Sequence, residues 1–189
     1  ERFMELKIFK RSSLQKKVVK DLRRSKDIPA VLYAPGKENE NIFIKGAEFS
    51  KNLAKIEKGH LSTTVFTLKT EDNRTFKALV KDIQYGKTNY AVLHIDFLQL
   101  QEEKMINVRV PIKCIGTDVC PGIKLGGNLR HAIRKIKVRC FPKDLPLEFI
   151  VDVKSLNLLD KIRINEINMP QGVTSITPVQ EVAIVIAKR

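Results

Sequence analysis

The chain of 189 residues contains no tryptophan, and phenylalanine and tyrosine together make up only 6% of it. A protein that binds single-stranded nucleic acid by stacking bases on exposed rings needs more aromatic side chains than this. No apolar run approaches the roughly 18 residues of a membrane-spanning helix, and no short apolar segment followed by a small-residue cleavage site opens the sequence. We therefore expect a cytoplasmic protein that does not contact a membrane.

Cysteine is also scarce. Cys114, Cys120 and Cys140 are odd in number, no Cys-x2-Cys unit is present, and His131 is the only imidazole near them in the sequence. Zinc sites and disulfide frameworks have regular ligand or cysteine spacings that this chain lacks. We expect buried, reduced thiols and neither metal nor cofactor, with a zinc site as the alternative.

Positive charge is abundant and concentrated. The chain has 35 Lys or Arg against 21 Asp or Glu, and its net charge is +14. Residues 7–26, here called the basic arm, carry a net charge of +8, and residues 130–143, the second basic segment, carry +6. These two segments account for the whole surplus. Concentrated positive charge favours a polyanionic partner, with nucleic acid first, although two solvated segments without a partner are the alternative.

The first half of the chain has the pattern of a small, strongly curved antiparallel sheet or barrel with short helices. Spacing of four between Leu14, Val18 and Leu22 predicts a basic helix over residues 13–25, capped by Ser12 or Ser13. A second helix is predicted from Phe49 to near Gly59. The predicted strands, several of them with alternating apolar residues, cover residues 7–9, 30–33, 43–44, 64–68, 76–80 and 90–97. Tight turns are expected at Pro35-Gly36 and at Asp72-Asn73.

A polar stretch from Gln99 to Lys104 separates this half from a second one that is almost entirely strand-like. Alternating or continuous apolar residues predict strands over residues 106–112, 136–140, 147–153 and 182–186. We expect a mostly β protein with a few short helices: an N-terminal small β-barrel over residues 1–98 and a C-terminal all-β domain over residues 99–189. Gly126-Gly127 is expected to form a tight turn, because a phosphate-binding loop would need a helix directly after it.

Two polar residues stand out on the last strand of the first half. The period of two places His94 and Asp96 on one strand face, opposite to Ile95 and Phe97. An enzyme could use such a pair with Asp82 for metal or acid–base chemistry, but the sequence has no third ligand at metal spacing and no nucleophile motif. The pair suits RNA binding better than catalysis, because His can stack on a base or donate a hydrogen bond to it, and Asp can accept a hydrogen bond from an amino group of a base.

The chain resembles a known family in an ordered set of motifs. Those in the first half are Arg11, Leu22-Arg23-Arg24, Ile28 to Tyr33, Asp82-Ile83-Gln84 and His94 to Phe97. They resemble the bacterial large-subunit ribosomal protein that binds 5S rRNA. The second half, through Gly126 to Leu129, Asp144-Leu145-Pro146, Val151-Asp152-Val153 and Pro170 to Val173, resembles the extra domain of the long, Ctc-type general stress protein form. One departure is Leu159, which stands where the family usually has glycine.

The resemblance implies a non-enzymatic ribosomal protein whose N-terminal barrel binds the loop E and helix IV region of 5S rRNA. Matching positions imply RNA contacts by Arg11, Lys16, Arg23, Tyr33, Gln84, His94 and Asp96. Charge adds Lys17, Lys20 and Arg24 as phosphate contacts. We expect 5S rRNA, other large-subunit rRNA and neighbouring ribosomal proteins as partners, a monomer when free, and a place on the ribosome. The alternatives are a stress-induced protein that binds ribosomes transiently, and a metal-dependent hydrolase using His94, Asp96 and Asp82.

Overall fold

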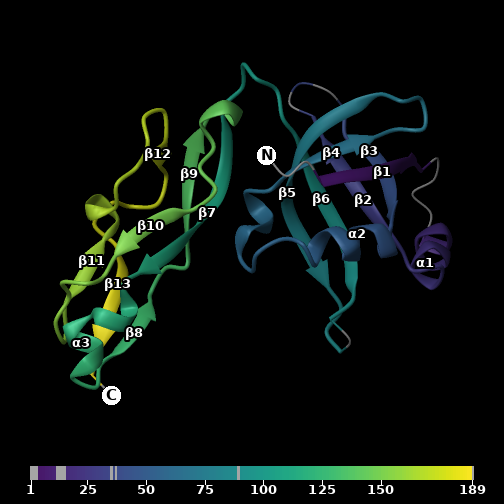
Figure 1. Cartoon of the computed structure of the whole chain (residues 1–189). Helices are drawn as coiled ribbons and strands as arrows, with labels where there is room; N and C mark the ends of the chain where they lie inside the picture. Colours follow the sequence, from purple (N-terminus) through teal and green to yellow (C-terminus); the bar gives the residue numbers. More distant parts are fainter. Residues whose placement is uncertain (1–3, 12–15, 35, 37, 89, 189) are drawn as a thin grey trace. The chain divides into compact units, whose positions relative to one another are not determined.

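The computed structural model describes residues 4–11, 16–34, 36, 38–88 and 90–188. Two compact units divide the chain, unit 1 ending at Lys104 and unit 2 beginning at Met105. Strands dominate both units and the helices are short (Figure 1). This confirms the expected fold class, a mostly β protein with an N-terminal barrel and a C-terminal β domain.

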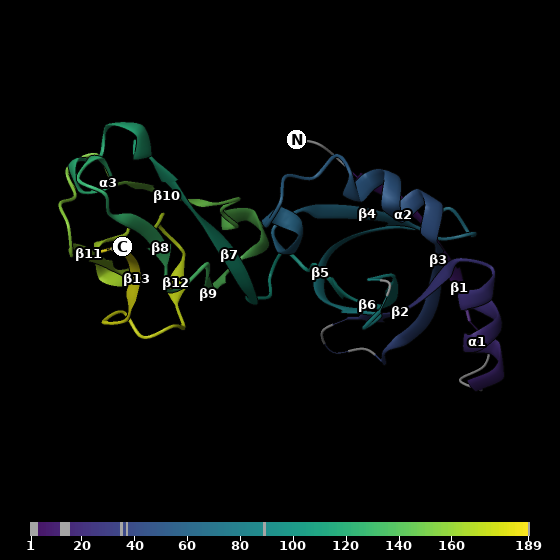
Figure 2. The ribbon, with the colours of Figure 1, turned by 90° about the horizontal axis from the view of Figure 1, so that it is seen from below.

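Unit 1 is a closed barrel. Its elements are β1 (Met4–Lys10), α1 (Lys16–Arg24), β2 (Asp27–Tyr33), β3 (Glu40–Lys45), α2 (Gly46–Leu53), the 3-10 turn η1 (His60–Ser62), β4 (Val65–Lys69), β5 (Thr75–Tyr85) and β6 (Val92–Gln99). The strands close in the order β1-β3-β2-β6-β5-β4, and α1 lies outside the wall (Figure 2). β1 pairs with β4, and β2 with β6, in parallel, whereas the other neighbours are antiparallel. Closure leaves no strand edge open in this sheet.

Alternating apolar side chains fill the barrel. The rings of Phe49, Phe66 and Phe97 are fully buried, with centroids 6.4 Å apart for Phe49 and Phe66 and 6.2 Å apart for Phe66 and Phe97. Phe49 comes from α2, and Asn52 Nδ2 of the same helix donates a hydrogen bond of 2.7 Å to the carbonyl oxygen of Glu5 on β1. α2 therefore packs against the barrel through both an apolar and a polar contact.

Both helices predicted in this half exist, with different limits. The helix predicted over residues 13–25 is α1, and its expected start, with Leu14 and the cap at Ser12 or Ser13, lies outside the described residues. The helix predicted to run from Phe49 to near Gly59 is α2, which ends at Leu53. Lys55 N and Ile56 N donate to carbonyls three residues back, so the chain tightens after α2 and Ile56 reaches the core without extending the helix.

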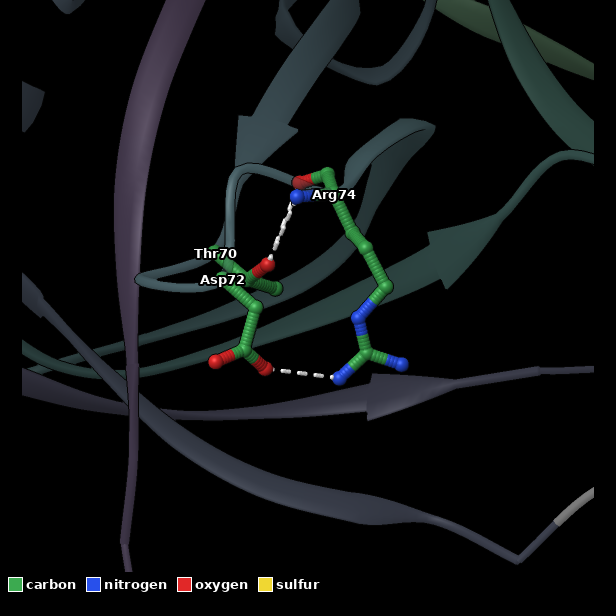
Figure 3. A network of polar contacts seen from close by, with 3 residues as sticks. All are labelled: Thr70, Asp72 and Arg74. Atoms are coloured by element: carbon green, nitrogen blue, oxygen red, sulfur yellow. Dashed lines mark hydrogen bonds and ion pairs between the residues drawn. The ribbon is translucent and has the colours of Figure 1, made fainter.

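The start of α2 and the turn between β4 and β5 each depend on the residues found there. Gly46 begins α2 beside the chain that leaves α1, and a Cβ at this position would lie 2.2 Å from the carbonyl oxygen of Lys26. Only glycine fits there. The predicted turn at Asp72-Asn73 is confirmed between β4 and β5: Asn73 has φ of 57°, Arg74 N donates to Thr70 Oγ1 at 3.1 Å, and the Arg74 guanidinium lies 2.9 Å from Asp72 Oδ2 (Figure 3).

Unit 2 consists of two sheets around a second core. Its elements are β7 (Ile106–Ile115), η2 (Thr117–Val119), α3 (Pro121–Lys124), β8 (Asn128–His131), β9 (Lys135–Cys140), η3 (Pro142–Asp144), β10 (Phe149–Asp152), β11 (Lys161–Arg163), η4 (Ile164–Glu166), β12 (Thr174–Ser175) and β13 (Val182–Ala187). One sheet has the order β10-β7-β9-β12 and the other β11-β13-β8. Val110, Ile136 and Ile184 are among the fully buried residues of this core. The strands that the sequence predicts here are present, whereas α3, β8, β11 and β12 were not predicted.

Two loops of unit 2, at Gly126-Gly127 and at Leu159, each contain a residue in the left-handed backbone conformation. Gly126 has φ of 89° and directly follows α3 and Leu125, and Gly127 N donates a 2.9 Å hydrogen bond to Gly122 O. The glycine pair therefore forms the tight turn that the sequence predicts, and this turn ends the short helix α3. Leu159 has φ of 70°, the left-handed conformation that glycine adopts freely and a bulky side chain adopts at a cost.

Candidate nucleic-acid interface

The strand register gathers the polar residues of β5 and β6 on the outside of the barrel. Residues opposite each other in an antiparallel pair share a face, and β5 and β6 place Gln84 opposite His94 and Asp82 opposite Asp96. Ile95 and Phe97, which alternate with the polar pair on β6, are fully buried. The prediction that His94 and Asp96 lie on the face of β6 opposite to Ile95 and Phe97 is therefore confirmed. On β5, Asp82 and Gln84 add two polar residues to the same outer surface of the barrel.

His94 and Asp96 are bonded to each other. His94 Nδ1 lies 3.0 Å from Asp96 Oδ1, and their side chains are 21% and 23% exposed. A carboxylate beside Nδ1 favours the tautomer with the proton on that nitrogen, so Nε2 is the nitrogen left for an external partner. The pair presents an oriented imidazole and a carboxylate at the surface, and these are groups that can meet base edges or 2′-hydroxyls.

A β-bulge brings a cation to the same side of the barrel. The register of β5 against β6 shifts between Val80 and Asp82, which leaves Lys81 as the extra residue. Lys81 Nζ lies 5.0 Å from the centroid of the Tyr33 ring on β2, a cation–π contact. Tyr33 is half-buried, and Gln84 is exposed.

Helix α1 separates its cations into two groups. At 100° per residue, Lys17, Lys20 and Arg24 lie on one exposed face, while Val18, Val19 and Leu22 form the half-buried face. Asp21 lies on the cationic face and pairs with Arg24 at 3.5 Å, with both side chains more than half exposed. Such an exposed pair contributes little to stability and leaves the face strongly positive.

Arg23 flanks the apolar side of α1 and binds the barrel. Its Nε and one terminal nitrogen donate to the carbonyl oxygen of Leu93 at 3.3 and 3.1 Å. Leu93 directly precedes His94 on β6, so this bidentate contact links the helix to the strand of the His94–Asp96 pair. The sequence and the resemblance marked Arg23 as an RNA contact; the structure gives this side chain an anchoring bond as well.

The remaining predicted residues lie at the end of β1 or outside the described part. Arg11 follows β1, and one of its terminal nitrogens donates to Asn41 Oδ1 at 3.2 Å. Its Nε is buried without a hydrogen-bond partner. The side chain of Lys16 lies outside the described residues. The structure therefore joins Arg23, Gln84, His94 and Asp96 around β6, adds Tyr33 from the neighbouring strand, and keeps Arg11 beside β3.

Sequence reasoning missed three residues near this face. Lys81 contacts Tyr33, and Tyr85 and Tyr90 flank the tip of the β5–β6 hairpin with exposed fractions of 49% and 80%. Exposed tyrosines at a hairpin tip are available for stacking on bases. The available signal was a pair of tyrosines on either side of Gly86 in a polar segment.

The cysteines lie in unit 2 as free thiols. Cys120 and Cys140 are buried, and Cys114 Sγ lies 3.8 Å from His131 Nε2. Burial raises the pKa of the Cys114 thiol, and burial together with the Asp144 carboxylate raises the pKa of Cys140. Thiols with raised pKa values stay protonated at neutral pH and are poor nucleophiles and metal ligands. Within the described ranges no cysteine belongs to a cluster of three or more potential metal ligands.

No helix in the described ranges combines the length and the apolar character that crossing a membrane requires.

Comparisons with known proteins match both units. The model of the ribosomal L25p family matches residues 6–97, and the model of the ribosomal protein TL5 C-terminal domain matches residues 105–189. The large ribosomal subunit protein bL25 of Chlamydia muridarum is 45% identical over 186 residues, covering 98% of this chain and 100% of that protein. The bL25 proteins of Chlamydia abortus and Chlamydia pneumoniae are 44% and 43% identical with the same coverage.

Proposed function

The chain belongs to the ribosomal L25p family of large-subunit ribosomal proteins, in the form that carries a TL5-type C-terminal domain, and from this premise we propose that it binds and stabilises 5S rRNA through unit 1. Its place is then on the large subunit in the cytoplasm. The family consists of ribosomal proteins and not of enzymes, so the hydrolase alternative built on His94, Asp96 and Asp82 is set aside.

One observation carries the proposal: Arg23 fixes the cationic helix α1 to the strand that holds the His94–Asp96 pair. Phosphate-binding cations and base-reading groups must act on one RNA at the same time, and this bond holds them in one surface. Lys17, Lys20 and Arg24 supply charge that releases counterions from RNA, which gives affinity. His94, Asp96 and Gln84 supply directional hydrogen bonds, which give specificity.

Double-stranded RNA of irregular shape suits this surface better than an unpaired strand. Around the His94–Asp96 pair the outer face of the barrel is polar: the Tyr33 ring is half-buried and contacts Lys81, and the exposed rings of Tyr85 and Tyr90 lie at the tip of the β5–β6 hairpin. Such a face offers few stacking platforms but several groups for the wide minor groove of an A-form helix and its 2′-hydroxyls. The loop E and helix IV region of 5S rRNA is the partner that the family resemblance implies.

A gel-shift titration with purified 5S rRNA tests the proposal. The full chain is expected to bind 5S rRNA at concentrations where an excess of an unrelated RNA duplex does not displace it. Equal competition by the unrelated duplex would show that the surface recognises only phosphate charge. Stoichiometry in salt-washed large subunits then separates a permanent component, at one copy per subunit, from a transient stress-induced binder, which salt removes.

A further inference from the structure

The second basic segment does not stay together in the fold. Arg130 lies on β8 in one sheet of unit 2, and Lys143 lies in η3 with its amine 5.8 Å from the Phe141 ring. Lys135, Lys137 and Arg139 alternate on β9 with the buried residues Ile136, Val138 and Cys140, so all three cations are on the outer face of the other sheet. β7 adds Arg109, which lies directly opposite Lys137.

These four residues, Arg109, Lys135, Lys137 and Arg139, are here called the basic sheet face. Strand geometry spaces alternate residues by about 6.4–6.8 Å and neighbouring strands by about 4.7–4.9 Å, so the four charges occupy a small area. The environment of Lys135 shows the crowding: burial first, and the positive charge of Arg109 second, lower its pKa. Uncharged polar residues flank Arg139, with Asn107 opposite on β7 and Thr174 opposite on β12.

Two acidic groups of this sheet lie away from the basic sheet face, and each is paired with a lysine. Glu148 and Asp152 belong to the β10 side, where Lys113 lies 3.5 Å from Glu148 and Lys154 lies 3.6 Å from Asp152. In the described part of the chain, Lys135, Lys137 and Arg139 have no carboxylate within ion-pair distance. Like charges directly opposite each other in a sheet repel, so the placement of Lys137 opposite Arg109 by itself weakens the sheet.

We propose that the basic sheet face is a second RNA-binding surface, which holds the sugar–phosphate backbone of a double-stranded RNA segment other than the one bound by unit 1. A regular grid of cations with flanking amide and hydroxyl groups matches a repeating array of phosphates and 2′-hydroxyls. Exposed aromatic rings, which single strands need, are not part of this face. The surface reads shape and charge and carries no base specificity.

The test uses the full chain and a short RNA duplex unrelated to 5S rRNA. A face variant carries Lys135→Gln, Lys137→Gln and Arg139→Gln. A matched control carries Lys124→Gln, Lys161→Gln and Lys188→Gln, three exposed lysines of unit 2 outside the face with the same total charge. Both are made in a background with Lys17→Gln, Lys20→Gln and Arg24→Gln, which weakens duplex binding by α1. All these positions are exposed, so the variants are expected to fold, and circular dichroism verifies this.

The face variant is expected to bind the duplex about 10- to 100-fold more weakly at moderate salt, and the slope of log K against log salt is expected to flatten by roughly 2 to 3. The control is expected to change binding less than threefold, because its lysines are dispersed. Equal losses in both variants, or no loss in the face variant, would overturn the proposal.

Two further arms separate this inference from other partners and from the proposed function. Vesicles with anionic lipid and a polyglutamate peptide are titrated against the same proteins, and loss of either interaction without loss of RNA binding would overturn the RNA assignment. Binding of 5S rRNA by the wild-type chain and by the face variant in the wild-type background is measured separately. If the face variant binds the duplex more weakly, the proposal for the basic sheet face stands even when the wild-type chain does not bind 5S rRNA. If the wild-type chain binds 5S rRNA but the face variant binds the duplex as tightly as the background protein does, the proposal fails.

Discussion

At the scale of single residues, Asp96 is the side chain whose chemistry tells most about unit 1. A carboxylate repels phosphates, and placing one beside a cationic helix weakens general RNA binding. Asp96 orients His94 through one oxygen at 3.0 Å. Its other oxygen is available to accept from a guanine or cytosine amino group. We propose that Asp96 stands on this face because its carboxylate recognises a hydrogen-bond donor of the RNA.

Asp96→Asn is expected to weaken binding to 5S rRNA and to leave binding to an unrelated duplex level or slightly tighter. Loss of one charge-assisted hydrogen bond costs about 1.5–3 kcal/mol, from which the relieved repulsion is subtracted. Parallel titrations of the two RNAs measure the difference. Asp72→Asn in the β4–β5 turn (Figure 3) removes the same charge from unit 1 just before β5 begins, whereas Asp96 lies opposite Asp82, further along that strand. If both variants bind 5S rRNA slightly better than wild type, Asp96 is only a solvated charge.

Arg23 and Lys20 belong to the same helix but are expected to act differently. Arg23→Ala removes the bond to Leu93 O and is expected to lower the free energy of unfolding by about 0.5–1.5 kcal/mol. It also frees α1 to move, so affinity for 5S rRNA falls. Lys20→Ala is expected to leave stability unchanged and to flatten the salt slope by roughly 1, as a lost phosphate contact does.

Urea unfolding and gel shifts at several salt concentrations measure both effects. Arg23→Lys is expected to restore little, because an ammonium cannot make the two-nitrogen contact of a guanidinium. Full rescue by lysine, with no change in stability for Arg23→Ala, would mean that Arg23 serves as a plain phosphate contact.

At the scale of elements, β7 and β9 show a conflict between stability and charge. Each strand packs one face against the core of unit 2. On the outer face, Arg109 lies directly opposite Lys137, and Lys135 is close enough for the charge of Arg109 to lower its pKa. A threonine in a strand packs well against its cross-strand neighbours, whereas two opposed cations repel each other. The sheet tolerates the repulsion because water and salt screen it.

Lys137→Thr is therefore expected to stabilise the free protein by about 0.2–1 kcal/mol in urea unfolding at low salt, with a smaller gain at high salt. In a separate Arg109→Gln variant, the pKa of Lys135 is expected to rise toward its ordinary value, since one of the two causes of its lowering is removed. NMR titration of the lysine side chains follows this change. A loss of stability in Lys137→Thr would show that the lysine packs favourably enough to outweigh its repulsion from Arg109.

At the scale of the whole molecule, each unit has a core of its own, one built on Phe49, Phe66 and Phe97 and the other on residues such as Val110, Ile136 and Ile184. The polar stretch from Gln99 to Lys104 follows the last barrel strand. Barrel pairing continues into this stretch, because Gln99 is opposite Ala78 on β5 and Leu100 N donates to Lys77 O at 2.8 Å. A complete barrel therefore needs residues beyond 98.

A fragment of residues 1–104 is expected to fold and to bind 5S rRNA within about a factor of 3 of the full chain, a difference well under the ~1.4 kcal/mol of a tenfold change. A fragment ending at residue 98 loses the pairing of Gln99 and Leu100 and is expected to be less stable by about 1–3 kcal/mol. Thermal unfolding and gel shifts compare the two. A folded 1–104 fragment that loses most of its affinity would assign part of the 5S rRNA contact to unit 2.

What the sequence alone determined about this protein follows from local rules. Period-two alternation placed His94 and Asp96 outward and Ile95 and Phe97 inward, and the four-residue spacing of Val18 and Leu22 placed a basic helix before β2. Charge counting located the two cationic segments. Alternating apolar residues predicted the fold class, and the ordered motifs indicated the family. None of these steps requires knowledge of which strands become neighbours.

What only the tertiary structure decided is which distant residues meet. Arg23 binds the carbonyl of Leu93, 70 residues away, and Lys81 lies over the Tyr33 ring because a bulge shifts the register of β5. The second basic segment disperses over two sheets, and only its β9 part joins Arg109 of β7 in one face. Cross-strand pairing depends on the register that closes each core, a long-range balance of packing and hydrogen bonding that no local pattern in the chain encodes.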